Sequence, residues 1–241
     1  MAPTVVLLHG FTHTGRSWDP VVAALGERYT AIAPDIRGHG AASSAEPVTL
    51  EAVIADVGAL ASERFTLVGY SMGGRIALHV ALADPGRIER LVLIGASPGL
   101  ADPGERERRR ADDEALAEEL ERSTIDEFAT RWARTPVLAG LPPQIAAAAH
   151  ADRLRSTPAG LARALRGLGT GALPPLWDRL GGLSMPVRLL VGGRDRRFQA
   201  IAAHMAAAIA HGRTHVVGGA GHAVHLEAPG AVASAISDTS R

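Results

Sequence analysis

The chain has 241 residues, a formal net charge of +0 and no cysteine, and all 25 of its basic residues are arginine because it has no lysine. Disulfides, thiolate metal sites and lysine Schiff bases are therefore excluded. The balanced charge argues against a nucleic acid or an anionic membrane as a partner. A chain of this length fits one large domain, or one domain with an insertion.

The start of the chain predicts neither a secretory signal nor a membrane anchor. It lacks the basic region followed by an apolar stretch that a signal peptide needs. No run of about 20 apolar residues, the length that spans a bilayer, occurs anywhere in the sequence. We therefore expect a cytoplasmic protein with no membrane contact, either a monomer or a weak homo-oligomer.

Six short apolar runs recur along the chain, at residues 4–8, 30–33, 66–68, 91–94, 187–191 and 214–217. Uniformly apolar runs are typical of parallel strands that are buried on both faces. Helix-like stretches lie between them, at residues 18–25, 50–62, 72–83, 198–210 and 231–237. This alternation predicts an α/β fold in which right-handed crossovers join about six parallel strands, with helices on both faces.

Between the fourth and fifth strands this alternation stops. Residues 95–186 contain no convincing strand and read as four helices, at about 105–122, 125–133, 143–155 and 158–168. Thr124 and Glu127 form a capping box, and Thr157 precedes a proline at the first helical position. A helical excursion of this size is typical of a lid over a site. We therefore predict a core of residues 1–94 and 187–241 and a helical cap of residues 95–186.

The strongest motif is Gly69-Tyr70-Ser71-Met72-Gly73, which matches Gly-x-Ser-x-Gly. An apolar strand precedes it and a helical pattern follows it, which is the context that this motif requires. The glycines permit a sharp turn that lifts the serine hydroxyl above the sheet, and the helix start offers free amides to a developing oxyanion. We therefore predict that Ser71 is reactive.

A reactive serine needs a base, and the base needs a carboxylate that orients it. His222 follows the last strand on a glycine-rich turn, and His225 three residues later is the alternative base. Asp195 follows the fifth strand. Both positions are carboxyl ends of strands, where ligands bind in open α/β sheets. The chain order Ser71, Asp195, His222 is that of α/β-hydrolase triads.

The oxyanion hole is assigned to backbone amides. His9-Gly10-Phe11 follows the first strand, where a loop supplies the second amide of such a hole. We therefore expect the N–H groups of Phe11 and Met72 to form it, since the hole needs only N–H donors. Asp35 and His39 read as structural turn residues. No metal site or organic cofactor is expected, because the loop histidines lack tetrahedral ligand spacing and no nucleotide-type phosphate loop occurs.

With these residues in place, the chain resembles the α/β-hydrolase superfamily from end to end. Within it, the chain is similar to the 2-succinyl-6-hydroxy-2,4-cyclohexadiene-1-carboxylate (SHCHC) synthases of menaquinone biosynthesis. The stretches that carry this resemblance are Gly69-Tyr70-Ser71-Met72-Gly73-Gly74-Arg75, Ser97-Pro98-Gly99-Leu100, Trp132-Ala133-Arg134-Thr135-Pro136-Val137, and Asp195 with Phe198. The chain departs from the pattern at Gly193, where an acidic residue is common.

The resemblance implies a lyase that eliminates pyruvate from a cyclohexene bearing succinyl, carboxylate and enolpyruvyl groups. It implies Ser71 as proton abstractor, His222 as relay and Asp195 as the residue that orients the histidine. It further implies substrate contacts from five residues, which are Tyr70, Arg75, Arg109, Trp132 and Arg153. The expected partner is thus a small anionic tricarboxylate, and guanidinium groups suit carboxylates because they bind them bidentately.

For several of these residues a structural role is an alternative to substrate binding. Arg75 lies in the first turn of a helix, where a cation opposes the helix dipole, and this favours a functional role. Arg109 lies in a helix rich in both charges, so a solvated surface explains it equally well, and Arg108 or Arg110 could face the pocket instead. Trp132 is as readily explained by core packing.

Two other functions remain open from the residues alone. The same triad permits a serine hydrolase that acts on an ester, a thioester or a carbon–carbon bond, and a covalent acyl-enzyme would reveal it. A ligand-sensing protein on a hydrolase fold is the third possibility, because a fold alone does not determine function. Ligand-dependent partner binding with negligible turnover would identify such a sensor.

Overall fold

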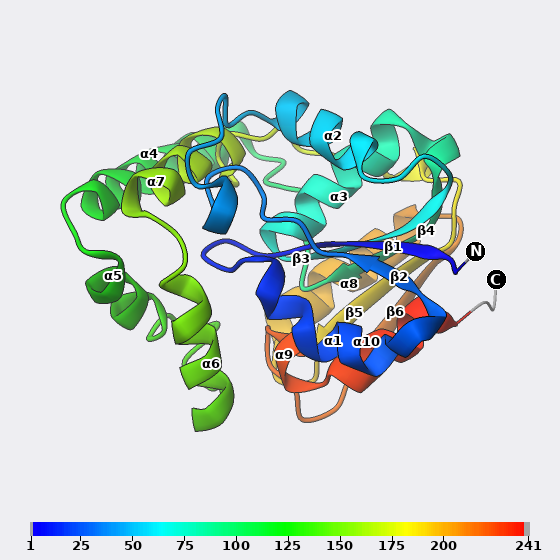
Figure 1. Ribbon diagram of the computed structural model, residues 1–241. Helices are drawn as coiled ribbons and strands as arrows, with labels where there is room; N and C mark the ends of the chain where they lie inside the picture. The colour runs from blue at the N-terminus through cyan, green and yellow to red at the C-terminus, as the bar shows by residue number, and fades with distance from the viewer. Residues whose placement is uncertain (1, 239–241) are drawn as a thin grey trace.

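The computed structural model describes residues 2–238 and contains a six-stranded sheet in which all neighbouring strands are parallel (Figure 1). The strands are β1 Thr4–Leu8, β2 Thr30–Ile32, β3 Phe65–Tyr70, β4 Ile88–Ile94, β5 Val187–Gly192 and β6 Gly212–Val217. Their order is β2-β1-β3-β4-β5-β6. The α/β fold with six parallel strands predicted from the sequence is therefore confirmed.

The strand order places a topological switch point between β1 and β3. The chain passes from β1 to β2 on one side and then crosses to β3 on the other side of β1. The loops that leave β1 and β3 therefore diverge and open a crevice at the carboxyl ends of these strands, which is where open α/β sheets bind ligands. Both the His9-Gly10-Phe11 loop and Ser71 lie at this crevice.

Helices cover both faces of the sheet, and each face has its own apolar cluster. The helices α2 Leu50–Ala59, α3 Met72–Ala83 and α8 Arg196–Ala208 pack on one face with residues such as Leu8 and Leu67. The helices α1 Asp19–Leu25, α9 Val224–Glu227 and α10 Pro229–Ser237 pack on the other face with Leu7 and Val68. Short 3-10 turns occupy Gly15–Trp18, Gly26–Arg28, Gly40–Ala42, Pro85–Arg87 and Trp177–Gly182.

Four helices lie between β4 and β5 and stand to one side of the sheet in Figure 1. They are α4 Pro103–Glu121, α5 Ile125–Trp132, α6 Pro143–Arg153 and α7 Pro158–Leu168. A separate apolar cluster, which includes Leu120, Phe128 and Leu161, joins α4, α5 and α7. The two N-caps expected from the sequence form, at Thr124 and at Thr157. The division at residues 95–186 into core and cap stays a prediction.

The two edge strands differ from the expectation of burial on both faces. The four central residues of β6 are exposed, and Val216 is 51% exposed. In β2, Thr30 is exposed and the next two residues are half-buried. An edge strand has a neighbour on one side only, so its apolar side chains are less completely covered than those of β3 and β5, which are buried throughout.

The fourth strand begins three residues before the predicted start. The expected run began at residue 91, whereas β4 begins at Ile88. Glu89 is exposed and Arg90 is half-buried. These two polar residues interrupt the apolar run, so the apolar pattern alone did not include the start of the strand. Within residues 2–238, none of the helices is both long enough and apolar enough to cross a membrane.

Candidate active site

Ser71 occupies a sharp turn between β3 and α3. Its backbone has φ 51° and ψ −109°, a region that residues other than glycine rarely adopt. Close backbone contacts explain the flanking glycines, because a Cβ on Gly69 would lie 2.4 Å from the oxygen of Gly73, and one on Gly73 would lie 2.3 Å from the oxygen of Leu8. This geometry presents the Ser71 hydroxyl at the carboxyl end of the sheet.

The structure brings His222, and not the alternative His225, to Ser71. The Nε2 atom of His222 lies 3.4 Å from the Oγ of Ser71, and its Nδ1 lies 2.7 Å from the Oδ2 of Asp195. His225 is fully buried, with its ring against Tyr70 and Trp18 at centroid distances of 4.1 and 4.8 Å. The three residues thus have the geometry of a Ser-His-Asp triad.

Asp195 is held so that it can remain ionised. Partial burial by itself raises the pKa of this carboxyl, but the hydrogen bond from His222 and a backbone bond outweigh it and lower the pKa below the usual value. The backbone bond comes from the Phe198 amide, which donates to Oδ1 at 3.2 Å. An ionised Asp195 fixes the His222 ring with Nδ1 protonated, which leaves Nε2 free to accept the serine proton.

A pocket of about 290 Å³ lies directly over this triad. The residues that line it include Ser71 and His222 from the triad, together with residues predicted to bind substrate or to form the oxyanion hole. These are Phe11, Met72, Arg75, Arg109 and Trp132. The loops after β1 and β6 therefore converge on one cavity with the helices α3 and α8, and α4, α5 and α7 form its outer wall.

The two amides assigned to the oxyanion hole are free in this structure. Within residues 2–238, the backbone N–H groups of Phe11 and Met72 donate no hydrogen bond to the protein. Met72 is the first residue of α3, so its amide is one of the unpaired donors of a helix start. Both residues line the pocket beside Ser71. Their role as an oxyanion hole stays a prediction.

Arg75 is a buried cation to which the described part of the chain offers no anionic partner. The residue is 7% exposed, its Nε atom has no hydrogen-bond partner, and its guanidinium forms no ion pair within residues 2–238. Burial and the nearby charge of Arg109 lower the pKa of Arg75 to about 10. Because an unpaired buried charge is costly, the side chain fits a site that receives an anion from outside the chain.

The structure also settles which arginine of the charged helix α4 lines the pocket. Arg109 lines it, whereas Arg108 and Arg110 do not. The Nε atom of Arg109 donates to Asp113 Oδ1 at 2.7 Å, and the other Asp113 oxygen accepts from the Gly171 amide at 3.2 Å. This bond uses Nε, so the two terminal nitrogens of the guanidinium remain available to a ligand.

Aromatic rings form the wall between cap and core. Trp132 stacks on Phe128 at a centroid distance of 5.7 Å and meets Phe11 edge-on at 5.3 Å. Phe198 lies 4.5 Å from the His222 ring on the other side of the site. Trp132 therefore fits both interpretations of the sequence, since it is half-buried against the apolar cluster of α4, α5 and α7 and also lines the pocket.

Tyr70 and Arg153 lie apart from this pocket, although the resemblance implied that both contact the substrate. Neither residue lines the cavity over Ser71. Tyr70 is 3% exposed and packs beneath Gly10, where a Cβ would lie 2.7 Å from its ring. Arg153 is 1% exposed, and its Nε donates to Thr12 Oγ1 at 3.2 Å. In this structure both residues support the loop after β1.

Three polar residues to which the sequence assigned no role in the site also line the pocket: Ser97, Thr170 and Arg197. Arg197 is exposed, and its guanidinium carbon lies 5.9 Å from the Phe198 ring. A sequence signal for Arg197 existed, because the residue lies two positions after Asp195 at the carboxyl end of β5. No local pattern marks Thr170, which the chain brings in from the segment after α7.

The chain is similar to known proteins over nearly its whole length. The model of a family described as the alpha/beta hydrolase family matches residues 5–235. A putative SHCHC synthase of Bacillus subtilis (strain 168) is 34% identical over 235 residues, which cover 93% of this chain and 85% of that protein. The SHCHC synthase of Salmonella schwarzengrund (strain CVM19633) is 34% identical over 251 residues, which cover 100% of this chain and 94% of that protein. The structure of MenH from S. aureus has a TM-score of 0.92 and 31% identity, with 98% of this chain and 92% of that chain covered.

Proposed function

This chain belongs to the alpha/beta hydrolase family, and we propose that it is an SHCHC synthase. As such it is a lyase that eliminates pyruvate from 2-succinyl-5-enolpyruvyl-6-hydroxy-3-cyclohexene-1-carboxylate in menaquinone biosynthesis. The observation that carries the proposal is the position of Arg75, a buried guanidinium without a partner in residues 2–238, in the same pocket as Ser71 and His222. A substrate with carboxylates supplies the anion that Arg75 lacks.

The pocket can bind an anion with more than one carboxylate. Arg75, Arg109 and Arg197 all line it, and a guanidinium binds a carboxylate through two parallel hydrogen bonds. We propose that they hold carboxylates of the tricarboxylate substrate and thereby set its orientation over Ser71. A direct substrate contact by Tyr70 or Arg153 stays a prediction of the resemblance, because neither lines this pocket.

The triad geometry supports proton abstraction by Ser71. Asp195 keeps the Nδ1 of His222 protonated, so the Nε2 can take the serine proton while the serine oxygen takes a proton from the ring carbon beside the succinyl ketone. The resulting enolate expels the enolpyruvyl group with cleavage of a carbon–oxygen bond. The proton held by His222 returns to the leaving group, which is released as pyruvate.

The amides of Phe11 and Met72 would stabilise the negative charge of this enolate. Fixed N–H donors aimed at a developing oxyanion lower the barrier because they need no reorganisation during the reaction. Removing a single donor of this kind costs a factor of about 10² to 10³ in rate. The free state of both amides in this structure is consistent with that role.

A pyruvate-release assay tests the proposal. The unstable substrate is generated in situ, and pyruvate is followed with a coupled dehydrogenase. We expect turnover by the wild-type protein, none above background for Ser71→Ala, and at least a 100-fold lower rate for His222→Ala, on the order of the losses seen for triad residues. Absence of pyruvate with fully folded wild-type protein would overturn the assignment.

Hydrolysis through an acylated Ser71 is the second function that the triad geometry allows. An acylation burst with aryl esters, together with no pyruvate release, would favour it. Slow ester cleavage alone would not separate the two functions, because an accessible triad attacks activated esters. The cytoplasmic location and the monomeric or weakly oligomeric state expected from the sequence stay predictions.

A further inference from the structure

The loop that follows β1 carries the proposed oxyanion amide and holds a disfavoured backbone conformation. Thr12 has φ +71° and is fully buried. A left-handed φ is unusual for a β-branched residue, whose side chain crowds the backbone there. Such a conformation persists only where the surroundings maintain it. Since Phe11 is the chain neighbour of Thr12, contacts that hold Thr12 also restrict the movement of Phe11 and its amide.

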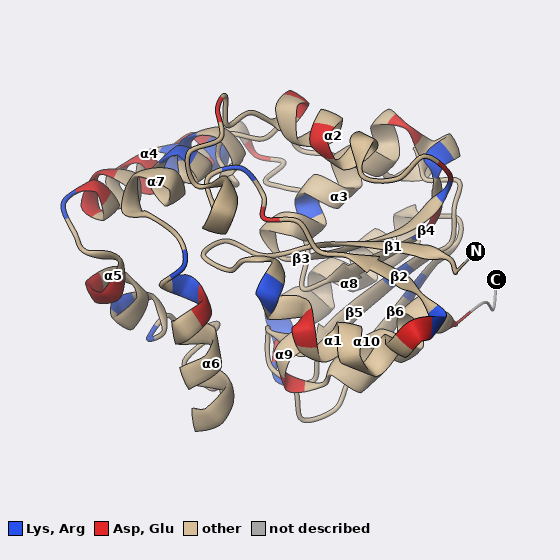
Figure 2. Cartoon of the chain, viewed as in Figure 1, with Lys and Arg blue, Asp and Glu red and all other residues tan. Residues whose placement is uncertain are grey.

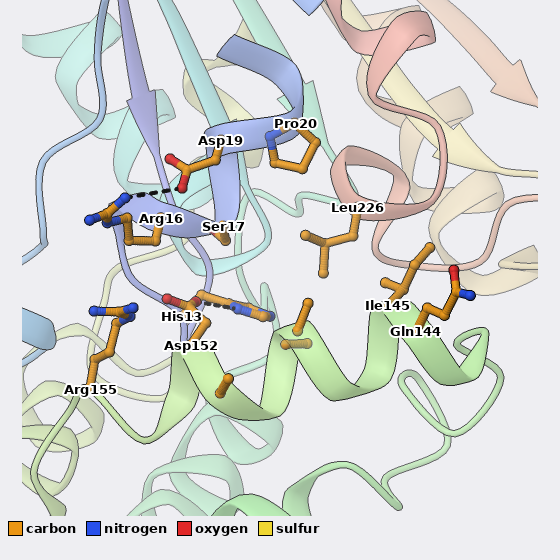
Figure 3. Close-up of a pocket in the computed structure, with 13 residues that line it drawn as sticks. His13, Arg16, Ser17, Asp19, Pro20, Gln144, Ile145, Asp152, Arg155 and Leu226 are labelled. Carbon is orange, nitrogen blue, oxygen red and sulfur yellow. Dashed lines mark hydrogen bonds and ion pairs between the residues drawn. The ribbon is translucent and has the colours of Figure 1, made fainter. Parts of the chain in front are cut away.

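Asp152, in the last turn of α6, makes three hydrogen bonds to this loop. Its Oδ2 lies 2.9 Å from the Nδ1 of His13 and accepts a hydrogen bond from the Thr14 amide at 3.0 Å. Its Oδ1 accepts from the Thr14 hydroxyl. Figure 3 shows the Asp152–His13 contact at the edge of a neighbouring pocket between α6 and the core. One carboxylate thus bridges the cap to three donors of the loop.

Arg153, the next residue, adds a fourth bond. Its Nε donates to the Oγ1 of Thr12, the residue with the disfavoured backbone, at 3.2 Å. Arg153, Asp152 and the three threonine and histidine residues of the loop that they contact are all at least 92% buried. We call this contact between residues 152–153 and residues 12–14 the loop clamp.

The position of Asp152 is not explained by helix stability. A carboxylate in the last turn of a helix opposes the helix dipole. Burying it also carries a penalty unless hydrogen bonds compensate. Burial raises the pKa of Asp152, but hydrogen bonding to His13 and Thr14 and the charge of His13 outweigh that effect and hold the pKa below its usual value. The loop therefore supplies the stabilisation that the helix does not.

We infer that Asp152 is a positioning residue, which acts from the cap helix α6 to hold the Phe11 amide in line with the enolate oxygen. The inference rests on the proposed function, because it assumes that the Phe11 amide belongs to the oxyanion hole. Oxyanion donors are effective only while they are fixed, and a displacement of about 1 Å can cost about 10²-fold in rate. The loop clamp thereby links the seating of the cap to the chemistry at Ser71.

The test compares Asp152→Asn with Asp126→Asn. Asp126 is a matched control because, like Asp152, its carboxylate contacts a histidine, which is His150 at 3.0 Å. Unlike Asp152, it lies on the exposed side of the cap, away from the loop. We expect Asp152→Asn to lower kcat by about 10- to 100-fold with a KM within about threefold of the wild type, because the carboxylates of the substrate still bind the arginines. Asp126→Asn should leave both constants unchanged.

A second pair of variants separates positioning from cap stability. Thr14→Val removes one donor to Asp152, whereas Thr14→Ser keeps the hydroxyl. We expect Thr14→Val to lower kcat and Thr14→Ser to retain it. Amide hydrogen exchange of the peptide covering residues 10–15 provides a readout that needs no activity. In Asp152→Asn the Thr14 amide should lose protection, while peptides from α4 and α7 keep theirs.

Three results would overturn the inference. One is Asp152→Asn with wild-type kcat, another is an equal loss in the Asp126→Asn control, and the third is unchanged exchange of residues 10–15. If wild-type protein released no pyruvate, the proposed function would fail separately. Unchanged exchange would then still refute the loop clamp, and increased exchange confined to residues 10–15 would support it.

Discussion

Arg75 combines a stability penalty with a binding role, and the two can be measured in one variant. Its guanidinium is buried without an anion from residues 2–238, so replacement by an apolar side chain of similar length removes an uncompensated charge. We expect Arg75→Met to increase the free energy of unfolding by about 1 kcal/mol or more. Urea denaturation at neutral pH measures this.

The same variant should bind the substrate poorly. A hydrogen bond to a charged group contributes about 1.5–3 kcal/mol, so we expect kcat/KM of Arg75→Met to fall by about 10- to 150-fold. A variant that was both less stable and fully active would show that Arg75 is structural. Arg75→Lys should recover only part of the loss, because an ammonium group lacks the planar fork of the guanidinium.

Arg197 and its neighbour Arg196 offer a matched comparison at the mouth of the pocket. Both are exposed arginines at the start of α8, but only Arg197 lines the cavity over Ser71. We expect Arg197→Gln to raise KM by about fivefold, since exposed charge pairs are weak, and Arg196→Gln to leave it unchanged. Steady-state kinetics at low salt checks this, and equal effects of both substitutions would indicate only a general loss of positive charge.

Among the elements, α4 shows what local sequence can and cannot determine. The caps at Thr124 and Thr157 follow from short-range rules, and the four helices appear within about two residues of the predicted bounds, although α4 begins at Pro103 behind an N-cap, Asp102, that was not predicted. Which arginine of α4 faces the pocket depends on how α4 is rotated against α7, a contact between segments far apart in the chain. The loop clamp also cannot be predicted from local sequence, because Asp152 and His13 are 139 residues apart in the chain.

The rotation of α4 depends in part on Asp113, and this can be tested. Asp113 is 4% exposed and joins Arg109 to the amide of Gly171. In Asp113→Asn the new NH₂ group faces one of these two donors, so we expect a loss of about 1–2 kcal/mol of stability and a higher KM. Asp112→Asn, an exposed neighbour on the same helix, should change neither. Thermal unfolding and steady-state kinetics of both variants provide the comparison.

Across the whole molecule, the net charge of zero conceals a local concentration of positive charge. Figure 2 shows acidic and basic residues interspersed along α4, and Arg166 of α7 pairs with both Glu114 and Glu121. The arginines that line the pocket include Arg75, which has no such partner among the described residues. The composition could not reveal this concentration of arginines in the pocket, because it depends on which side chains the fold turns inward.

Buried histidines in the loops above the sheet give the molecule a defined response to acid. His9 and His39 are fully buried with their rings 4.9 Å apart, and burial lowers the pKa of His9 to about 4 and that of His39 to about 3. The unfolded chain protonates these rings near pH 6.5, whereas the folded chain does not. Below that pH the unfolded state therefore binds more protons, and stability falls as the pH falls towards 4.

Between pH 6.5 and pH 5 each of these two histidines should reduce the free energy of unfolding by about 1.5 kcal/mol. His39→Gln removes one titrating group while keeping a polar side chain, so its stability should depend less steeply on pH across this window. The wild type and His39→Gln are compared by urea unfolding at pH 7, 6 and 5. Parallel curves for the two proteins would mean that His39 is protonated equally in the folded and unfolded states, contrary to its complete burial.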